Sequence, residues 1–392
     1  MTETNQTVSV NLSRKGNQVN KSTGTIGILS TILGQTHVPS FYNLVRILQS
    51  SSRVMVVEVG VEGLEVDPSR RPPETTTIVH RHGQGLIFTI LSYLWTQVRI
   101  ANRIASLAKR VDAWYFFLAD NMILPLMAAR LSGRRVYLVM GGLYRMDVQH
   151  KQNAVDFLMV PLETLGLRLS AGIILYSPRL VSAWNLQRYE SKIHIAYQHF
   201  LDLDEFNVRA PLESRRTAIG HIGRLSGEKG TINFLHSIPY VLRSRTDVSY
   251  VVGGDGPLGD EARILAKKLG SGNVQFLGWV SQVDMPDVLN QLKLLVLPSY
   301  TEGLPNIMIE AMACGTPVLA TKVGAIPDFI EDGSTGFLME SNSPASIASN
   351  ILRALEYEHL DEVSMRARAL VEEKFTYECA LKMWTGVTRE SK

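Results

Sequence analysis

The sequence predicts an α/β protein of two doubly wound, Rossmann-like domains that face one another across a cleft. Its length of 392 residues corresponds to between two and three domains, at roughly 150 residues per domain. Hydrophobic residues make up 45% and charged residues 20%, which excludes collagen-like, coiled-coil and wholly disordered chains. Short β-branched runs alternate with amphipathic segments, and this alternation is typical of βαβ units on a parallel sheet.

The N-terminal segment lacks the pattern of a secretory signal peptide. It is rich in Thr, Asn, Ser and Gln and has no apolar run after its charged positions. We therefore expect residues 1–24 to be a flexible polar tail. Residues 25–205 form the predicted first domain, and its expected strands are Thr25–Leu29, Val54–Val59, Ala113–Leu118 and Val136–Met140.

The most apolar window of the first domain is the run GLIFTILSYLWTQV at 85–98. Its 14 residues are fewer than the roughly 18 that a membrane-spanning helix needs. The segment continues to residue 110 with a helical apolar stripe and an opposite face that carries Lys and Arg. Two interpretations stay open: a helix packed on the sheet, or a helix lying on a membrane surface.

The alternation is more regular in the predicted second domain, residues 206–374. Its expected strands are Ala218–Ile222, Val248–Gly253, Val274–Leu277, Leu294–Leu297 and Val318–Thr321, and its expected helices are Ile232–Leu242, Glu261–Leu269, Met285–Leu292 and Asn306–Cys314. Doubly wound domains bind ligands at the carboxyl ends of their strands, so functional residues are expected in the loops that follow strands.

The strongest motif is the run SYTEGLPNIMIEAMACG at 299–315, which follows a strand and opens a helix near Asn306. Backbone N–H groups at a helix N-terminus, together with the helix dipole, bind phosphate. Glu310 lies about one turn inside this helix, and the two oxygens of a carboxylate suit a vicinal diol such as that of a ribose. Glu302, on the preceding loop, is placed to reach the group attached to the phosphate.

A second motif, Gly223-Arg224 with Lys229-Gly230, follows the first strand of the same domain. Gly223 allows the backbone to approach a ligand closely. The Arg224 guanidinium can bind phosphate oxygens in a fork, and Lys229 adds a point charge. At the carboxyl end of a strand, both cations are expected to point into the cleft.

A third motif, Gly254-x-Gly256-x-x-Gly259, has the letters of the dinucleotide-binding fingerprint. The acidic partner of the ribose is expected about 20 residues further on, but the strand near Val274 ends without a carboxylate. A tight turn near a nucleotide is the favoured interpretation, and an NAD-dependent oxidoreductase is an alternative.

In their order and spacing these motifs resemble glycosyltransferase family 4, the retaining, nucleotide-sugar-dependent glycosyl transferases group 1 of two-domain GT-B fold. The resemblance covers roughly residues 217–355 and also includes Val323–Asp328 and the run Asp332-Gly333-x-x-Gly336. It implies that Glu310 holds the ribose, that Glu302 contacts the donor sugar, and that Arg224 and Lys229 neutralise the diphosphate. Residues 375–392 resemble the terminal helix that returns to the first domain in this family.

The resemblance implies a set of catalytic residues and a set of donor-binding residues. The expected catalytic residues are Arg224, Lys229 and Glu302, and the expected donor-binding residues are Gly223, Gly254, Gly256, Gly303, Leu304, Pro305, Asn306 and Glu310. Two cations and a helix end can stabilise a diphosphate leaving group, so no divalent metal and no cofactor is expected. The run Asp202-Leu203-Asp204 has the letters of a metal-binding motif but falls at the crossover between the domains.

The first domain departs from the family pattern. Its first loop has a single glycine, Gly34, followed by His37, and the strand that ends near Met140 is followed by Gly141 where family members commonly have a histidine. Gly34, His37 and Gly141 are therefore the cleft candidates of this domain. The crossover contains His199, which, like His37, is either a cleft residue or a structural histidine.

Charge is divided unevenly between the halves. Residues 1–205 carry 21 Lys and Arg against 15 Asp and Glu, net +6, and residues 206–392 carry 19 against 22, net −3; together they give the net charge of +3. This balance does not favour nucleic-acid binding. Two cysteines cannot form a disulfide framework, as in a cytoplasmic protein.

The favoured function is transfer of a sugar from a UDP- or GDP-linked donor to a glycan or lipid-linked acceptor held by residues 25–205. Such a reaction serves the synthesis of cell-surface polysaccharides or glycoconjugates. The basic first half also predicts peripheral contact with an anionic membrane, on its inner face. A sugar-nucleotide-binding protein without catalysis stays open as a further alternative.

Overall fold

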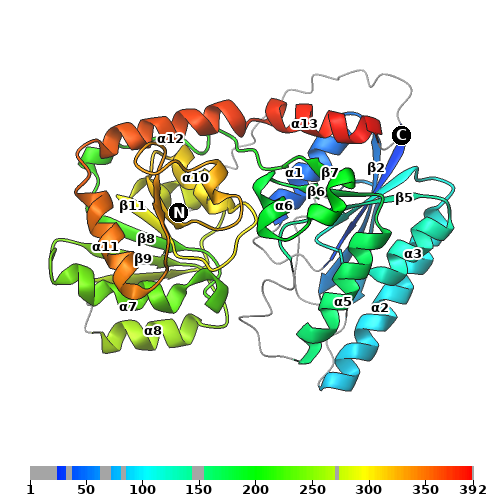
Figure 1. Ribbon diagram of the computed structural model, residues 1–392, viewed down its shortest axis with the longest axis horizontal. Coiled ribbons are helices and arrows are strands. Elements are labelled where there is room, and N and C mark those ends of the chain that lie inside the picture. The colour runs from blue at the N-terminus through cyan, green and yellow to red at the C-terminus, as the bar shows by residue number, and fades with distance from the viewer. Residues whose placement is uncertain are drawn as a thin grey trace, which may run out of the picture.

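The structure is a computed structural model that describes residues 24–31, 38–61, 72–80, 85–143, 154–269 and 273–390. It contains two separate parallel sheets, each covered by helices on both faces (Figure 1). The first sheet is built from the first half of the chain and the second from the second half. The predicted fold class, two Rossmann-like doubly wound domains, is confirmed.

The N-terminal sheet has seven described strands in the order β3-β2-β1-β4-β5-β6-β7, all paired in parallel. The strands are β1 (Thr25–Ser30), β2 (Arg53–Val61), β3 (Thr75–His80), β4 (Ala113–Phe117), β5 (Arg135–Val139), β6 (Gly172–Leu175) and β7 (Ile193–Ile195). The central strands are buried along their length because helices cover both faces, so their residues are continuously apolar rather than alternating.

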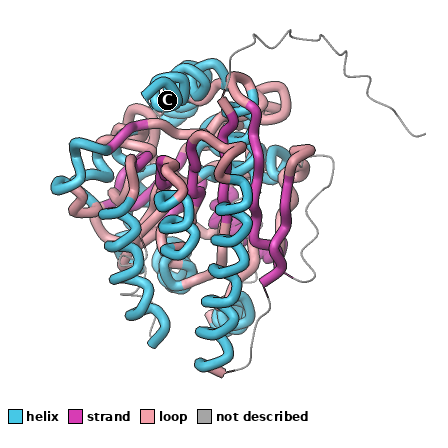
Figure 2. The backbone as a smooth tube through the Cα atoms, turned by 90° about the vertical axis from the view of Figure 1, so that its right-hand side faces the viewer, coloured by secondary structure: helices cyan, strands magenta, loops and turns pink. Residues whose placement is uncertain are grey.

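The helices of this domain cover both faces of its sheet, and the direction of each crossover decides which face a helix covers. Helix α1 (Val38–Gln49) lies on one face, whereas α2 (Leu86–Leu107), α3 (Ile123–Leu131) and α5 (Ala154–Leu169) lie together on the other, and α6 (Arg179–Ala183) follows β6. Figure 2, which turns this domain toward the viewer, shows long helices in front of the strands. The segment at 85–110 is therefore a helix against the sheet that also keeps an exposed face.

The C-terminal sheet has six described strands in the order β10-β9-β8-β11-β12-β13. They are β8 (Ala218–Ile222), β9 (Ser249–Gly253), β10 (Val274–Gly278), β11 (Leu294–Leu297), β12 (Val318–Thr321) and β13 (Phe337–Met339). The helices are α7 (Thr231–Leu242), α8 (Gly259–Lys268), α9 (Met285–Asn290), α10 (Asn306–Ala313), α11 (Pro344–Leu355) and α12 (Leu360–Lys374). This strand order reverses between β8 and β11, and ligands of such sheets bind at that point.

The last helix, α13 (Tyr377–Glu390), continues the line of α12 across the top of both domains (Figure 1). It packs on α1 of the N-terminal domain. Trp384 in α13 is buried, and its indole N–H donates to the backbone oxygen of Tyr197 at 3.2 Å. The end of the chain thereby ties the two domains together.

Candidate active site

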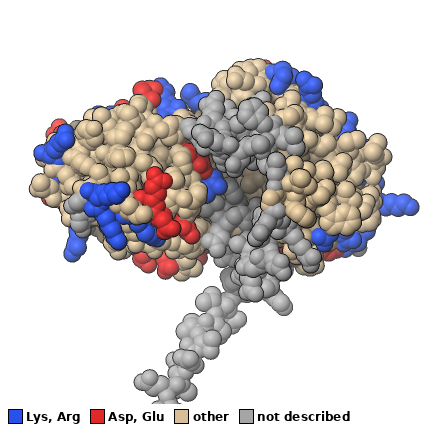
Figure 3. Space-filling view, turned by 90° about the horizontal axis from the view of Figure 1, so that it is seen from below, with Lys and Arg blue, Asp and Glu red and all other residues tan. Residues whose placement is uncertain are grey.

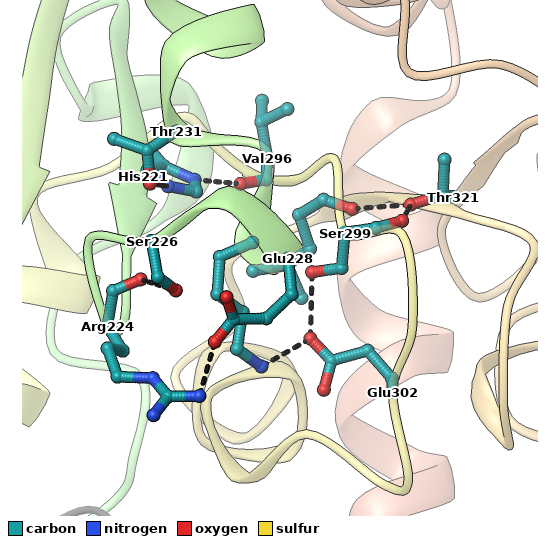
Figure 4. Close-up of polar contacts among 11 residues, drawn as sticks. His221, Arg224, Ser226, Glu228, Thr231, Val296, Ser299, Glu302 and Thr321 are labelled. Atoms are coloured by element: carbon teal, nitrogen blue, oxygen red, sulfur yellow. Dashed lines mark hydrogen bonds and ion pairs between the residues drawn. The ribbon is translucent and has the colours of Figure 1, made fainter. Parts of the chain in front are cut away.

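Two loops meet at the point where the strand order of the C-terminal sheet reverses. One follows β8 and contains Arg224 and a short 3-10 turn at Gly227–Lys229; the other follows β11 and contains Ser299 and Glu302. The backbone N–H of Tyr300 donates to the oxygen of Glu228 at 2.8 Å, which joins the loops directly. Figure 4 shows the polar side chains of both loops pointing toward one another.

His221 in β8 fixes the base of this arrangement. One ring nitrogen contacts the oxygen of Val296 in β11 and the other the hydroxyl of Thr231 in α7, both at 3.1 Å. Burial lowers the pKa of His221 to about 4, so the ring is neutral. The histidine therefore positions the strand and the helix and carries no charge into the site.

Lys229 and Glu302 form the centre of the site. The Lys229 ammonium donates to Glu302 Oε1 at 2.7 Å, and the hydroxyl of Ser299 donates to the same oxygen at 2.8 Å. Glu302 is only 8% exposed. The residue expected to neutralise the diphosphate and the residue expected to contact the donor sugar thus lie in direct contact.

Arg224 is held by a second carboxylate. Its guanidinium pairs with Glu228, one turn further along the same loop. Burial by itself would raise the pKa of Glu228, but backbone hydrogen bonds, Arg224, Ser226 and Lys229 together hold it below its ordinary value. Glu228 is therefore ionised, and this ion pair holds Arg224, whose side chain is half exposed.

Helix α10 begins immediately after this loop. Pro305 occupies its N-cap position and makes no side-chain cap, so the first N–H groups of the helix are available to an anion. Leu304 is buried. The Asn306 amide donates to the hydroxyl of Ser40 in α1 at 3.0 Å, so the N-terminal ends of a helix from each domain meet here.

Glu310 lies inside α10 and is 5% exposed. Gln282, in the loop after β10, donates to Glu310 Oε1 at 2.9 Å. Burial raises the pKa of Glu310 to about 7, although the bond from Gln282 opposes this shift. A second hydrogen-bond donor, such as a sugar hydroxyl, would be needed to satisfy the remaining acceptor positions of an ionised Glu310.

The glycines of the third motif have a packing role. A Cβ atom on Gly254 would lie 1.8 Å from the backbone oxygen of Gly223, and one on Gly256 would lie 2.5 Å from that of Leu225. The backbone hydrogen bond from Leu225 N–H to the Asp255 oxygen, 2.9 Å long, closes the same contact. These glycines are required because the loop after β9 packs on the loop after β8, which supports the tight-turn interpretation.

Gly303 is where the two domains approach most closely near the site. A Cβ atom there would lie 2.2 Å from the backbone oxygen of Gly141, so only glycine allows this contact. The Gly303 oxygen accepts from the N–H of Ala325 at 2.9 Å, which explains the second run of the family motif, Val323–Asp328, as a support of this loop. Gly141 therefore lies against the site, as expected of a cleft candidate.

A buried polar cluster of the N-terminal domain adjoins Gly141. It contains His199, a candidate from the sequence, and Gln198 and Tyr176, whose contact was not predicted. The Gln198 amide donates to the hydroxyl of Tyr176 at 3.1 Å, and the rings of Tyr176 and His199 pack edge to face, with 4.8 Å between their centroids. Gln198 Oε1 and His199 Nδ1 are buried without a hydrogen-bond partner among the described residues. Burial lowers the pKa of His199 to about 3, so the ring is neutral.

The remaining candidate residues from the sequence either lie outside the described residues or have a local structural role. Gly34 and His37 lie outside the described residues. Asp202 Oδ1 accepts from the N–H of Asp204 at 3.0 Å, which makes this run a local turn. Within the described ranges, no group of three or more His, Cys, Asp or Glu side chains is arranged to hold a metal ion. None of the described helices is long and apolar enough to cross a bilayer.

Sequence reasoning missed the partners that orient the predicted residues. Glu228 and Ser299 lie inside the motifs, but no group of the expected ligand required a glutamate or a serine at these positions. Gln282 and Tyr176 are brought in from loops after other strands. Their one available signal was position, because each follows the carboxyl end of a parallel strand.

Two facing Rossmann-like domains, a terminal helix that crosses between them and paired loops at the strand reversal define the class of GT-B glycosyltransferase folds. The fold agrees with solved structures: HepE of Anabaena, in complex with UDP and glucose, matches at a TM-score of 0.72 and 17% identity over 92% of this chain and 99% of that chain. Sucrose-phosphate synthase of Thermosynechococcus elongatus matches at a TM-score of 0.75 and 18% identity over 94% and 98%.

Residues 216–357 match the family model of the glycosyl transferases group 1, which confirms the resemblance drawn from the motifs. Among characterised relatives, alpha-D-kanosaminyltransferase of Streptomyces kanamyceticus is 28% identical over 211 residues, 52% of this chain and 55% of the relative. Alignments with three such relatives span between 25% and 66% of their lengths.

Proposed function

We propose that the protein is a retaining glycosyltransferase that moves a sugar from a nucleotide diphosphate donor to a glycan or lipid-linked acceptor. One observation carries the proposal: Lys229 pairs with Glu302 across two loops that are bonded to one another, the first of which also carries Arg224. The second loop leads into helix α10, with its uncapped N-terminus and the buried Glu310. This arrangement offers cations and N–H groups to a diphosphate and acceptor oxygens to the sugars on either side of it.

The chemistry follows from where charge develops. Breaking the bond between the sugar carbon and the diphosphate builds negative charge on the leaving oxygen. Arg224, Lys229 and the helix end would stabilise this charge. Each such contact would lower the activation barrier by on the order of 3 kcal/mol. The acceptor oxygen would bond to the carbon on the face that the diphosphate leaves, and its proton would pass to the diphosphate. Before this step, on donor binding, Lys229 would exchange Glu302 for phosphate, which would free that carboxylate for the donor sugar.

We also propose the division of labour between the domains. Residues 206–374 hold the donor, residues 25–205 the acceptor, and residues 375–392 join them. A UDP donor is supported by the structures of HepE, which contain UDP, UDP with glucose, or UDP-glucose; GDP is the other candidate base. Side-chain cations supply the charge that a divalent metal would bring, so we propose metal-independent transfer.

The test is a panel of nucleotide diphosphate sugars with release of nucleoside diphosphate as the readout. With the accepted donor, we expect Glu310→Ala and Arg224→Ala to lose about a hundredfold or more in the rate of release. Glu358→Ala, at an exposed position, and Arg245→Ala, at a partly exposed position paired with Asp247, lie outside the site, serve as matched controls and should retain it.

Other outcomes identify the alternatives. Full release by both site variants would contradict the proposal. Donor binding without release under any acceptor would instead indicate a sugar-nucleotide-binding protein, for which the missing histidine at Gly141 is the specific reason. A rise in melting temperature with dinucleotides, but not with sugar nucleotides, would indicate the nicotinamide enzyme.

A further inference from the structure

Helix α2 carries a continuous apolar stripe that faces outward. Ile87, Phe88 and Trp95 are 72%, 66% and 65% exposed. Leu91, Leu94 and Val98 are exposed between and beyond them, at the spacing that places side chains on one face of a helix. The opposite face of the helix, which includes Ile100 and Ile104, is fully buried against the sheet. The helix-on-sheet interpretation of the 85–110 segment is therefore confirmed, and the exposed second face leaves the membrane-surface interpretation as a prediction.

Helix α3 extends this apolar surface sideways. The Tyr93 hydroxyl donates to the Asn121 oxygen at 3.1 Å, and the Gln97 side chain accepts from the Leu124 N–H at 3.0 Å, so the two helices lie side by side. Leu124, Met127 and Leu131 of α3 are exposed, Leu131 at 84%. We call the surface formed by the exposed apolar residues of α2 and α3 the outer apolar face.

The charged residues that helices α2 and α3 contribute to the outer apolar face are all cations. Helices α2 and α3 contain no Asp or Glu. Arg99 lies on the flank next to β3, where it donates to the Val79 oxygen at 2.9 Å, and Arg130 lies on the flank next to α5, where it contacts the Leu169 oxygen. Arg168 on α5 is also exposed. None of these three guanidinium groups has a salt bridge within the described part of the chain.

The placement of this surface relates it to the site. The N-terminal ends of helices that follow parallel strands lie at the carboxyl edge of the sheet, the edge that carries Gly141. In Figures 1 and 2 the N-terminal part of α2 projects past the end of the strands on this side. Viewed from below, this domain is largely tan, with Lys and Arg at its margins (Figure 3).

We propose that the outer apolar face is a docking surface for an anionic lipid bilayer, with α2 lying in the interface and Arg99, Arg130 and Arg168 contacting lipid phosphates. This inference rests on the proposed function and deepens it. A docked N-terminal domain would lie at the membrane that holds a lipid-linked acceptor. No described helix can cross the bilayer, so the contact is peripheral.

The chemistry of the surface favours a bilayer over a protein partner. An apolar stripe with Phe and Trp, bordered by the cations Arg99, Arg130 and Arg168, is complementary to acyl chains beneath a layer of anionic headgroups. Aromatic rings prefer the boundary between the two layers. A protein partner would need carboxylates placed around an apolar patch of matching shape. The stripe and its flanking cations are well matched by a bilayer, which needs no such shape.

The experiment is flotation of the full chain with vesicles of phosphatidylcholine alone or mixed equally with phosphatidylglycerol, at low salt. We expect binding to the anionic vesicles, and the double variant Phe88→Ser/Trp95→Ser should weaken it by at least about tenfold. The double variant Val283→Ser/Met365→Ser removes two equally exposed apolar side chains from the C-terminal domain and should bind as the wild type does. Arg99→Gln/Arg168→Gln should lose about tenfold on anionic vesicles only.

Each result has a definite meaning. Absence of wild-type binding to anionic vesicles, or equal binding by Phe88→Ser/Trp95→Ser, overturns the proposal. A wild-type dimer that this variant converts to a monomer, without vesicle binding, overturns it in favour of a contact between two copies of the chain. UDP-induced thermal stabilisation, measured on the same variants, reports folding and the donor site separately. Flotation that persists when no sugar nucleotide binds would leave the docking surface standing while the proposed function fails.

Discussion

At the scale of single residues, Glu310 combines two demands that oppose one another. Its side chain is almost fully buried, and burial raises its pKa to about 7, whereas binding a sugar diol is strongest for the ionised carboxylate. A buried group with a raised pKa binds its proton more tightly in the folded than in the unfolded chain. Folding stability therefore decreases as pH rises from the ordinary carboxyl range through about 7.

This conflict gives a prediction for the variant Glu310→Gln. At pH values above the raised pKa, the variant should unfold at a higher temperature than the wild type, because it removes a cost of up to roughly 3 kcal/mol. The advantage should disappear at acidic pH, where Glu310 is protonated. Donor affinity should show the opposite sign: the wild-type KM for the donor rises as pH falls below about 7, and that of the variant stays high throughout.

Thermal unfolding and initial-rate kinetics across this pH range check both parts of the prediction. Glu358→Gln, an exposed glutamate of the same domain, is the control and should follow the wild type in stability and in KM. If Glu310→Gln showed the wild-type pH dependence of KM, a different group would control donor binding.

Residue types and their spacing were enough to select Arg224, Lys229, Glu302 and Glu310 as candidates, because their charges and hydrogen-bonding groups suit a diphosphate and a ribose. They could not predict that Lys229 contacts Glu302 at 2.7 Å or that Gln282 reaches Glu310. Those contacts depend on how loops from different strands pack. The sequence marked Gly141 only as the position where a histidine is missing. Its contact with Gly303 depends on how the two domains pack, which the sequence alone does not show.

At the scale of elements, the strongly apolar strands were predicted within a residue or two, and so were helices α7 to α10 of the C-terminal domain. Helices α1, α3, α5 and α6 of the N-terminal domain were not predicted. The strands that were missed are β3, β6, β7 and β13. They are short or, in β3, rich in threonine and half exposed, so hydrophobic periodicity gave little signal. Helix α2 shows the limit of such patterns. Its apolar residues predict that one face of the helix is buried, but they do not show whether the other apolar face is also covered.

Helix α13 is the element whose removal should matter most for the joint between the domains. Trp384 is buried, its ring lies 5.8 Å from that of Tyr115, and it donates to the Tyr197 oxygen. We predict that Trp384→Ala lowers the free energy of unfolding of the N-terminal domain by about 3 to 5 kcal/mol, measured by denaturant titration with near-UV circular dichroism. Met365→Ala, at an exposed position of α12, should change it little. Equal stability of the two variants would show that α13 is not anchored in the core.

At the scale of the whole molecule, described residues of the two domains meet at several places around the site, and three of these contacts involve its loops. Asn306 bonds Ser40, Gly303 meets Gly141, and Asp328 accepts hydrogen bonds from the Ser177 hydroxyl and from Arg179 Nε, the latter at 2.9 Å. Asp328 belongs to the loop whose Ala325 supports Gly303. The third contact therefore links closure of the domains to the position of the loop beside the donor site.

This link predicts the behaviour of Asp328→Ala. Loss of its hydrogen bonds to Ser177 and Arg179 should cost about 1 to 2 kcal/mol of domain association, which shifts the ratio of closed to open molecules by about five- to thirtyfold. The radius of gyration from small-angle scattering should increase, and the KM for the donor should increase with it, because the loop at Gly303 loses its support. Asp332→Ala is the matched control: Asp332 pairs with Arg353 inside the C-terminal domain, so the variant removes an ion pair without touching the interface. An unchanged radius and KM in Asp328→Ala, or equal changes in both variants, would show that Asp328 does not hold the domains closed and that the remaining contacts suffice.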